Sequence, residues 1–285
     1  GYLFRSEFLV AAIIARSVGV SYPAINASDL MRLSIPVPRV DEQSAIATFL
    51  DREIAKIDAL IAEQEKLIAL LKEKRQALIS HAVTKGLDPN APMKDSGIEW
   101  LGQVPVHWEV AQIKRLSTVK RGASPRPIDD PRYFDDDGKD AWVRSTDVSS
   151  SDGVLTETTQ RLSDLGSSLS VKLAPGSLFV SIAGTVGKPC ITGIDACIHD
   201  GFVYFPTLKL EPKFLYRIFE AGSCYAGLGK FGTQLNLNTD TIGSIFVAVP
   251  QRDEMFQILD YLDRTTNALD ALVGQVERAS DLLKE

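Results

Sequence analysis

One uninterrupted stretch, residues 41–81, decides how this chain can fold: it reads DEQSAIATFLDREIAKIDALIAEQEKLIALLKEKRQALISH. The stretch is rich in Ala, Glu, Lys and Leu and contains neither Gly nor Pro, which is the composition of a helix. Its apolar residues recur in steps of three and four, a 3.5-residue period typical of a coiled-coil seam. About 40 residues predict a helix of ~60 Å, which ends where Gly86 and Pro89 follow.

A helix of this length cannot bury its apolar stripe by itself, and a second helix of the same kind begins at Asp253. We expect the two helices to pack antiparallel and to hold the flanking domains at a fixed separation. The alternative is that each helix packs only on its own domain. The residues predicted to pair the helices are Ile46, Leu50, Ile57, Ile61, Leu71, Leu78, Ile258, Leu262, Leu269 and Val276.

Both helices belong to an internal repeat, in which residues 26–73 match residues 238–285 without a gap. Shared proline, asparagine and acidic positions outside the helices argue against a chance likeness of two leucine-rich segments. The repeat predicts the tail of one unit followed by nearly all of a second, so that the first unit is incomplete at its N-terminus. Matching pairs include Asn26 with Asn238, Pro38 with Pro250, Asp51 with Asp263 and Arg5 with Arg217.

The repeat divides the chain into four regions. Residues 1–40 are the remnant of a first globular unit, 41–86 the long helix, 87–250 a second globular domain and 251–285 the second, truncated helix. Within 87–250, short β-like runs at 142–144, 177–182, 202–205 and 244–249 alternate with turn residues, and 212–221 has a helical pattern. We expect a mixed α/β domain with a curved, mostly antiparallel sheet, flanked by long coiled-coil-forming helices.

Composition narrows the class of protein. The formal net charge of −6 over 285 residues excludes a uniformly basic nucleic-acid coat. Three cysteines form no disulfide framework and match no zinc spacing, which predicts a reducing, cytoplasmic location. The apolar runs are shorter than the ~20 residues that a transmembrane helix needs, so no membrane is expected.

The sequence contains no motif whose residue types and spacing match a known catalytic site. The glycines of residues 184–188 have the wrong spacing for a phosphate-binding loop, which predicts a turn with Lys188 exposed. The three histidines have no metal-ligand spacing, and nothing resembles a methyltransferase or nuclease centre. We predict no catalytic and no metal site. A hydrolase that uses His199 and Asp200 is the alternative, although no Gly-x-Ser-x-Gly motif supplies a nucleophile; a scaffold that binds protein is another.

Two segments have a composition that suits DNA. Residues 114–132 hold six basic and two acidic residues and predict a loop that approaches phosphates, although a solvated surface has the same composition. Residues 230–238 carry side chains that can read bases or can cap turns. The predicted DNA-binding residues are Lys114, Lys120, Arg121, Arg126, Arg144, Lys188, Lys230, Thr233, Gln234 and Asn236.

Three stretches together resemble the specificity subunits of type I restriction-modification systems. Residues 35–79 resemble the central conserved region of that family, residues 93–109 its entry into a target recognition domain, and residues 175–188 an internal strand-turn signature. The second repeat departs at Met255, where the first has Gln43.

The resemblance implies that residues 1–40 and 87–250 come from two target recognition domains, each of which reads one half of a split site in double-stranded DNA. It implies that the paired helices set the spacing between half-sites and dock two modification (methyltransferase) subunits, which restriction/translocase subunits join. S-adenosylmethionine, ATP and Mg would belong to those partners. This chain would then be a non-catalytic recognition subunit without a cofactor of its own.

Overall fold

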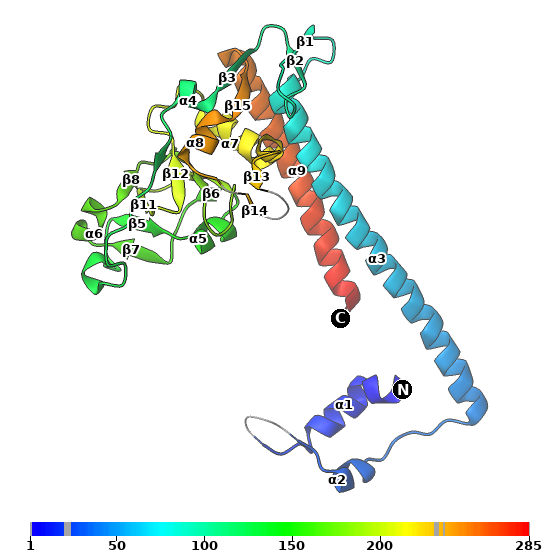
Figure 1. Cartoon of the computed structure of the whole chain (residues 1–285). Coiled ribbons are helices and arrows are strands. Elements are labelled where there is room, and N and C mark those ends of the chain that lie inside the picture. The colour runs from blue at the N-terminus through cyan, green and yellow to red at the C-terminus, as the bar shows by residue number, and fades with distance from the viewer. Residues whose placement is uncertain (1, 20–23, 231–233, 236, 285) are drawn as a thin grey trace. The chain divides into compact units, whose positions relative to one another are not determined.

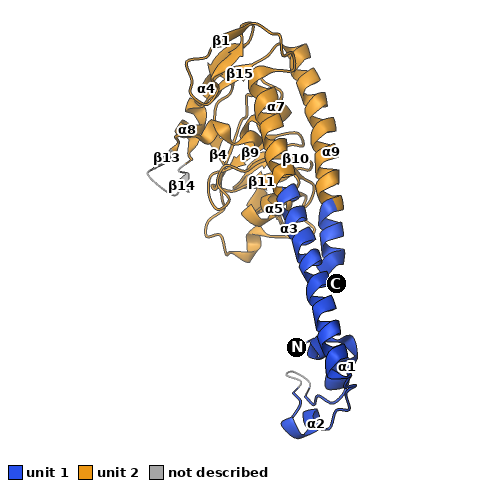
Figure 2. Cartoon of the chain, turned by 90° about the vertical axis from the view of Figure 1, so that its right-hand side faces the viewer, with its two compact units in different colours: residues 1–68, 276–285 blue, residues 69–275 orange. Residues whose placement is uncertain are grey.

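The computed structural model describes residues 2–19, 24–230, 234–235 and 237–284, with strands β13 and β14 described by their backbone alone. The chain forms two compact units, residues 1–68 with 276–285 (unit 1) and residues 69–275 (unit 2) (Figure 2).

Two long helices dominate the elements (Figure 1). Helix α3 covers Val40–Lys85 and helix α9 covers Arg252–Lys284. Their first residues are 212 positions apart, which is the offset between Pro38 and Pro250 in the repeat. Each helix has two acidic residues in its first turn, where the helix dipole favours negative charge. The predicted helices are therefore confirmed over their described length.

Unit 1 holds three short helices before α3: η1 (Tyr2–Arg5), α1 (Glu7–Ile14) and α2 (Ala27–Met31). The Asn26 side chain caps α2 by accepting a hydrogen bond from the Asp29 N–H. Its repeat partner Asn238 caps the helix that follows it in the same way. The asparagines that the two repeats share are therefore N-caps, a role for which Asn is a preferred residue.

Unit 2 contains two principal sheets. One has the strand order β4 (Lys120–Arg121), β12 (Phe202–Tyr204), β9 (Leu178–Ser181), β10 (Pro189–Thr192), β6 (Val154–Leu155). The other has the order β7 (Gln160–Leu162), β5 (Asp140–Val143), β11 (Ala196–Ile198), β8 (Val171–Leu173). Two-stranded pairs are β1 (Met93–Asp95) with β2 (Gln103–Pro105), β3 (Glu109–Gln112) with β15 (Phe246–Val249), and β13 (Gly229–Lys230) with β14 (Gln234–Leu235).

The described strand pairs are antiparallel except β6 with β10 and β5 with β11. The mixed α/β class with mostly antiparallel pairing is thus confirmed, but the strands divide between two main sheets where we expected one. The reason is a three-residue connection, 199–201, which takes the chain from β11 in one sheet to β12 in the other.

Short helices connect these strands. Helix α7 (Pro212–Ala221) has the predicted bounds and buries Phe214, Leu215, Ile218 and Phe219. The others are α4 (Ile113–Leu116), η2 (Pro131–Tyr133), α5 (Ser145–Ser150), α6 (Asp164–Ser168), η3 (Ser223–Tyr225) and α8 (Thr239–Ser244).

The core of unit 2 includes the seam of the long helices. Ile79 and Val83 of α3 share one hydrophobic cluster with Ile258 and Leu262 of α9 and with Phe214 of α7. The two helices therefore pack on each other and on their domain at the same time, and the two sequence-based alternatives coexist in unit 2.

Two contacts show that α3 and α9 run antiparallel within unit 2. Arg75 of α3 forms an ion pair with Asp270 of α9, and Gly86, which follows α3, lies beside the side chain of Glu254 in the first turn of α9.

The predicted helix-pairing residues fall into two groups. In unit 2, Leu71, Ile258, Leu262 and Leu269 are buried and Leu78 is half-buried. In unit 1, Ile46 and Ile57 are 48% and 39% exposed, while Leu50, Ile61 and Val276 are half-buried. Among the described helices, none is both long enough and apolar enough to cross a bilayer.

Candidate nucleic-acid interface

Strand ends of both main sheets meet at one end of unit 2. Parallel strands β5 and β11 end together, with Val143 paired to Ile198. At the same end, Ser181 is the last residue of β9 and pairs with Phe202 of β12. Arg121 is the last residue of β4 and pairs with Val203 of β12. Four connections therefore emerge side by side: residues 122–130, 144–150, 182–188 and 199–201. We call them the loop cluster.

Asp200 ties the first of these loops to the last. Its Oδ1 accepts a hydrogen bond from the Ser124 hydroxyl at 3.0 Å, and its Oδ2 forms an ion pair with Arg126 at 2.9 Å. The Arg121 guanidinium donates to the Asp200 main-chain carbonyl. Burial acts to raise the pKa of Asp200, but the Ser124 hydroxyl and the two arginines outweigh it and lower the pKa. The carboxylate is therefore charged at neutral pH.

Backbone contacts hold residues 199–201 between the two sheets. The Gly201 carbonyl accepts N–H hydrogen bonds from Ile182 at 2.8 Å and Ala183 at 3.2 Å. A Cβ added at Gly122 would lie 2.2 Å from the His199 carbonyl oxygen. Only glycine permits this approach, because no side-chain carbon fits at that distance.

A second set of contacts joins α5 to residues 182–188. The hydroxyls of Ser149 and Thr185 are 2.9 Å apart, and the Lys188 ammonium donates to the main-chain carbonyls of Ser149 at 3.0 Å and Ser151 at 3.4 Å. The predicted turn is present, but Lys188 is half-buried and bound to carbonyls. The expectation that Lys188 is exposed was wrong, because the turn folds back onto α5.

The basic segment 114–132 is not one loop, and the expectation that its charge gathers on a loop was wrong. Lys114 lies on α4, where it lines a small pocket with α8. Lys120 and Arg121 form the edge strand β4, and Arg132 is paired with Asp130 at 2.6 Å. The segment divides because Lys120 and Arg121 join the sheet by pairing with β12.

Exposed cations nevertheless gather at the loop cluster. Lys120, Arg121 and Arg144 are exposed and form no ion pair within the described part of the chain. Arg126 is exposed but paired with Asp200. Lys and Arg on an edge strand also discourage edge-to-edge association, which is the structural reason for Lys120 and Arg121 that needs no ligand.

The second predicted base-reading segment is only partly described. Lys230 and Gln234 lie in β13 and β14, whose side chains are not described, and Thr233 and Asn236 lie outside the described residues. Their assignment to DNA stays a prediction.

His199 and Asp200 are not hydrogen-bonded to each other as the histidine and carboxylate of a catalytic triad are. The Nδ1 atom of His199 accepts the Gly201 N–H at 2.8 Å and is 3.9 Å from Asp200. In a catalytic triad that nitrogen must donate to the carboxylate. No hydroxyl in the described ranges hydrogen-bonds to the His199 ring. The geometry therefore favours a non-catalytic role for this pair.

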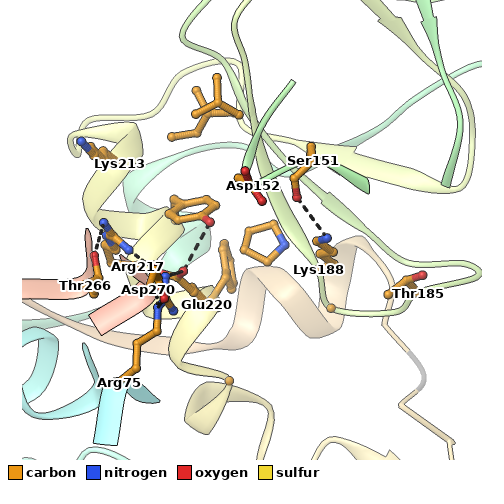
Figure 3. A pocket seen from close by; sticks show the side chains of 18 of the residues that line it. Arg75, Ser151, Asp152, Thr185, Lys188, Lys213, Arg217, Glu220, Thr266 and Asp270 are labelled. Atoms are coloured by element: carbon orange, nitrogen blue, oxygen red, sulfur yellow. Dashed lines mark hydrogen bonds and ion pairs between the residues drawn. The ribbon is translucent and has the colours of Figure 1, made fainter. Parts of the chain in front are cut away.

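A cavity of about 1000 Å³ lies between residues 151–154, residues 185–189 and the long helices in unit 2 (Figure 3). Its wall carries an ionic network centred on Arg217, which is 7% exposed. Arg217 pairs with Glu220 at 2.7 Å and with Asp263 of α9 at 2.8 Å. Arg75 of α3 pairs with the same Glu220 at 3.0 Å. The network joins α7 to both long helices.

This network was not predicted from the sequence, although the repeat contained the signal. Arg217 and Asp263 match Arg5 and Asp51 at the same offset. A basic and an acidic residue that recur together, one 35 residues before the start of the long helix and one inside it, are candidates for an ion pair.

Where α9 begins, its first turn contacts the last residues of the motif at 93–109. Glu254, in the first turn of α9, accepts hydrogen bonds from Trp108 Nε1 at 3.0 Å and from His107 Nε2 at 2.8 Å. Trp108 is fully buried. His107 and Trp108 thus anchor the entry of the domain to α9.

Comparison with known proteins decides the family. The sequence profile of the family described as "Type I restriction modification DNA specificity domain" matches residues 2–70 and 105–277. The chain belongs to this family. The resemblance expected from residues 35–79, 93–109 and 175–188 is thereby confirmed.

Relatives within the DNA specificity family come from archaea and bacteria. The chain is 28% identical over 122 residues to the type I restriction enzyme MjaVIII specificity subunit of Methanocaldococcus jannaschii, covering 42% of this chain and 27% of that protein. It is 22% identical over 285 residues to the type I restriction enzyme EcoBI specificity subunit of Escherichia coli, covering 95% of this chain and 59% of that protein. The chain thus spans about a quarter to three fifths of these relatives.

Solved structures of the family share the fold. One solved structure concerns the complex assembly and conformational transition of the type I R-M system. It has a TM-score of 0.76 at 20% identity, and the match covers 99% of this chain and 66% of that chain. The HsdS subunit from Thermoanaerobacter tengcongensis has a TM-score of 0.59 at 17% identity, covering 99% and 67%. The mixed α/β fold class with long helices is therefore confirmed.

Proposed function

We propose that this chain is the sequence-specific DNA-binding specificity subunit of a type I restriction-modification complex, or part of one. Its loop cluster contacts one half of a bipartite site in double-stranded DNA. The paired helices set the half-site spacing and dock two modification subunits, with restriction/translocase subunits completing the complex. Catalysis, with S-adenosylmethionine, ATP and Mg, belongs to those partners. The three cysteines are buried free thiols, which suits a reducing cytoplasm.

One observation carries this proposal. In a chain that belongs to the DNA specificity family, exposed Lys120, Arg121 and Arg144 are gathered where four connections, one of which contains α5, leave the two main sheets. Exposed cations that form no ion pair can bind phosphates, and loops of mixed sequence between them can vary without disturbing the strands. This combination suits a module that positions itself on the DNA backbone and reads bases nearby.

The helical part of the proposal rests on unit 1. Along α3, Ile46, Phe49 and Leu60 are 48%, 54% and 44% exposed. Large apolar side chains in a row on a helix indicate a surface that a protein partner covers. We assign this surface to the modification subunits.

The backbone-contact role is tested with the double variant Lys120→Ala and Arg121→Ala in the assembled complex. Counterion release predicts weaker binding to all duplex sequences and a log K against log salt slope that is shallower by about 1 for each lost phosphate contact. The measurement is a fluorescence-anisotropy titration of duplex DNA at several salt concentrations.

Arg132→Ala is the matched control, because the Arg132 guanidinium is already paired with Asp130. Its slope should equal that of the unchanged protein. An unchanged slope in the double variant would remove β4 from the interface. Full partner binding without sequence-selective DNA retention would instead support the scaffold alternative. Methylation profiling of a genome that carries the complete system would identify the target sequence.

A further inference from the structure

His199 lies at the centre of the loop cluster, in the three-residue connection between the two main sheets. Its ring centroid is 4.5 Å from that of Phe202 and 5.9 Å from that of Trp142. A Cβ added at Gly201 would come within 2.3 Å of the His199 Cε1 atom. Two aromatic rings therefore pack near the imidazole, and the absence of a side chain at Gly201 leaves room for it.

Hydrogen bonding then decides where the ring proton lies. The Gly201 N–H donates to Nδ1 at 2.8 Å, so Nδ1 is the acceptor and the neutral ring carries its proton on Nε2. Within the part of the chain that the structure describes, Nε2 has no hydrogen-bond partner, and it is not among the enclosed polar atoms. The side chain is 22% exposed. Nε2–H is thus an accessible, oriented donor without an acceptor.

Burial, helped by two nearby cations, favours the neutral form of the ring. Burial lowers the pKa of His199, Arg121 and Arg144 act in the same direction, and Asp200 opposes them. A neutral donor gains less from a phosphate than the arginines beside it do. Its fixed direction suits instead an acceptor whose position is itself fixed, such as an atom on the edge of a stacked base.

We propose that His199 is a specificity-determining residue, whose Nε2–H donates a hydrogen bond to an acceptor atom on the edge of one base in the half-site. In the major groove that acceptor is N7 of a purine or the keto oxygen of guanine or thymine. Cytosine offers neither, so His199 disfavours cytosine at this position of the strand it contacts. The inference rests on the proposed function of the loop cluster.

Selection from a randomised duplex pool by the assembled complex tests the inference, because such a pool contains every candidate half-site. His199→Phe keeps an aromatic ring and removes the donor, and His199→Gln keeps an N–H donor. His81→Ala is the matched control, because His81 is an exposed histidine on α3 away from the loop cluster.

We expect the unchanged complex and His81→Ala to select the same motif. His199→Phe should lose the base preference at one position and keep it at the others. Its affinity for the parent motif should fall about 3- to 10-fold, the range for one neutral hydrogen bond, and His199→Gln should retain part of the preference. Replacing the purine at that position by its 7-deaza analogue, guanine by 2-aminopurine, or thymine by 5-methyl-2-pyrimidinone, which lacks the O4 atom, identifies the acceptor as N7 or the keto oxygen. The matching analogue should weaken the unchanged complex and leave His199→Phe unaffected.

Two results would overturn the inference. One is an identical motif of equal strength from His199→Phe. The other is that no analogue at any selected position weakens binding by the unchanged complex. The analogue arm uses the unchanged protein, so it remains decisive even if a variant folds poorly. If the unchanged complex selects no motif at all, the proposed function fails, which is a separate outcome.

Discussion

At His199, the contacts that hold the ring also oppose its protonation. Phe202 and Trp142 remove water from the imidazole, and Arg121 and Arg144 add positive charge beside it. Each of these effects disfavours the imidazolium form, and the Asp200 carboxylate counteracts them only in part. The neutral, oriented donor is a product of local packing, so it should be measurable without DNA.

We predict that His199 titrates below the value of ~6.5 for an unperturbed histidine. The folded protein then binds fewer protons than the unfolded one below that pH. This contribution to stability is constant above about pH 6.5 and decreases as the pH falls through the folded pKa. NMR titration of the imidazole signals gives the pKa directly. Urea unfolding at pH 7.5 and 5.5 should show a larger acid-induced loss for the unchanged protein than for His199→Phe; equal losses would contradict the prediction.

At the scale of elements, α7 connects the globular domain to the long helices. Its apolar face enters the core through Phe214 and Ile218, and Arg217 makes the ionic network with Asp263 and Glu220. Because the pairing partners lie on three helices of unit 2, the network specifies how α7 sits against the helix pair. Apolar contacts alone would tolerate sliding between these helices.

Arg217→Ala should lower the free energy of unfolding by about 1.5–3 kcal/mol, the range for hydrogen bonds to charged groups, because it removes two ion pairs and leaves Glu220 with Arg75 and Asp263 with Lys213. Arg264→Ala is the matched control, since Arg264 and Asp260 form an exposed pair one helical turn apart, with side chains 74% and 67% exposed. Its cost should be below about 0.5 kcal/mol. Denaturant unfolding monitored by circular dichroism compares the two. Equal effects would show that the network contributes no more than a surface pair.

At the scale of the whole molecule, net charge is a poor guide to what the chain binds. The total of −6 includes residues 251–285, with four basic and eight acidic residues, a stretch that contains helix α9 (Arg252–Lys284). Lys120, Arg121 and Arg144, which are exposed and form no ion pair within the described residues, lie instead at the loop cluster. Electrostatic attraction to DNA falls off within ~10 Å at 0.1 M salt, so the local distribution decides binding.

The two long helices should have different roles in unit 1 and in unit 2. Ile57→Asp, at a position 39% exposed in unit 1, should leave unit 2 folded while weakening assembly with the modification subunits. Leu262→Ala, at a fully buried seam position in unit 2, should lower the free energy of unfolding by about 2–5 kcal/mol. Size-exclusion chromatography with light scattering measures assembly, and thermal unfolding measures stability. Intact assembly of Ile57→Asp would contradict the docking role of α3.

Much of the architecture follows from the sequence alone. The 3.5-residue period and the absence of Gly and Pro predicted α3, and the repeat predicted that α9 starts at the equivalent position. The bounds of α7 were predicted as observed. These features depend on hydrophobic periodicity and on residues near in sequence, which a single chain displays directly. The motifs of residues 35–79, 93–109 and 175–188 were also sufficient to indicate the family.

Only the tertiary structure decided the candidate site. Lys188, Arg126 and Arg132 look alike in the sequence, yet one binds carbonyls of α5 and the other two are paired with aspartates. Whether a cation is free depends on which acidic groups and carbonyls the fold brings near it. The loop cluster itself exists because strands distant in sequence pair with their ends in register, so that His199 meets Gly122 and Trp142. Such long-range pairing leaves no periodic trace in one sequence, and the site therefore became visible only once the strands were assembled.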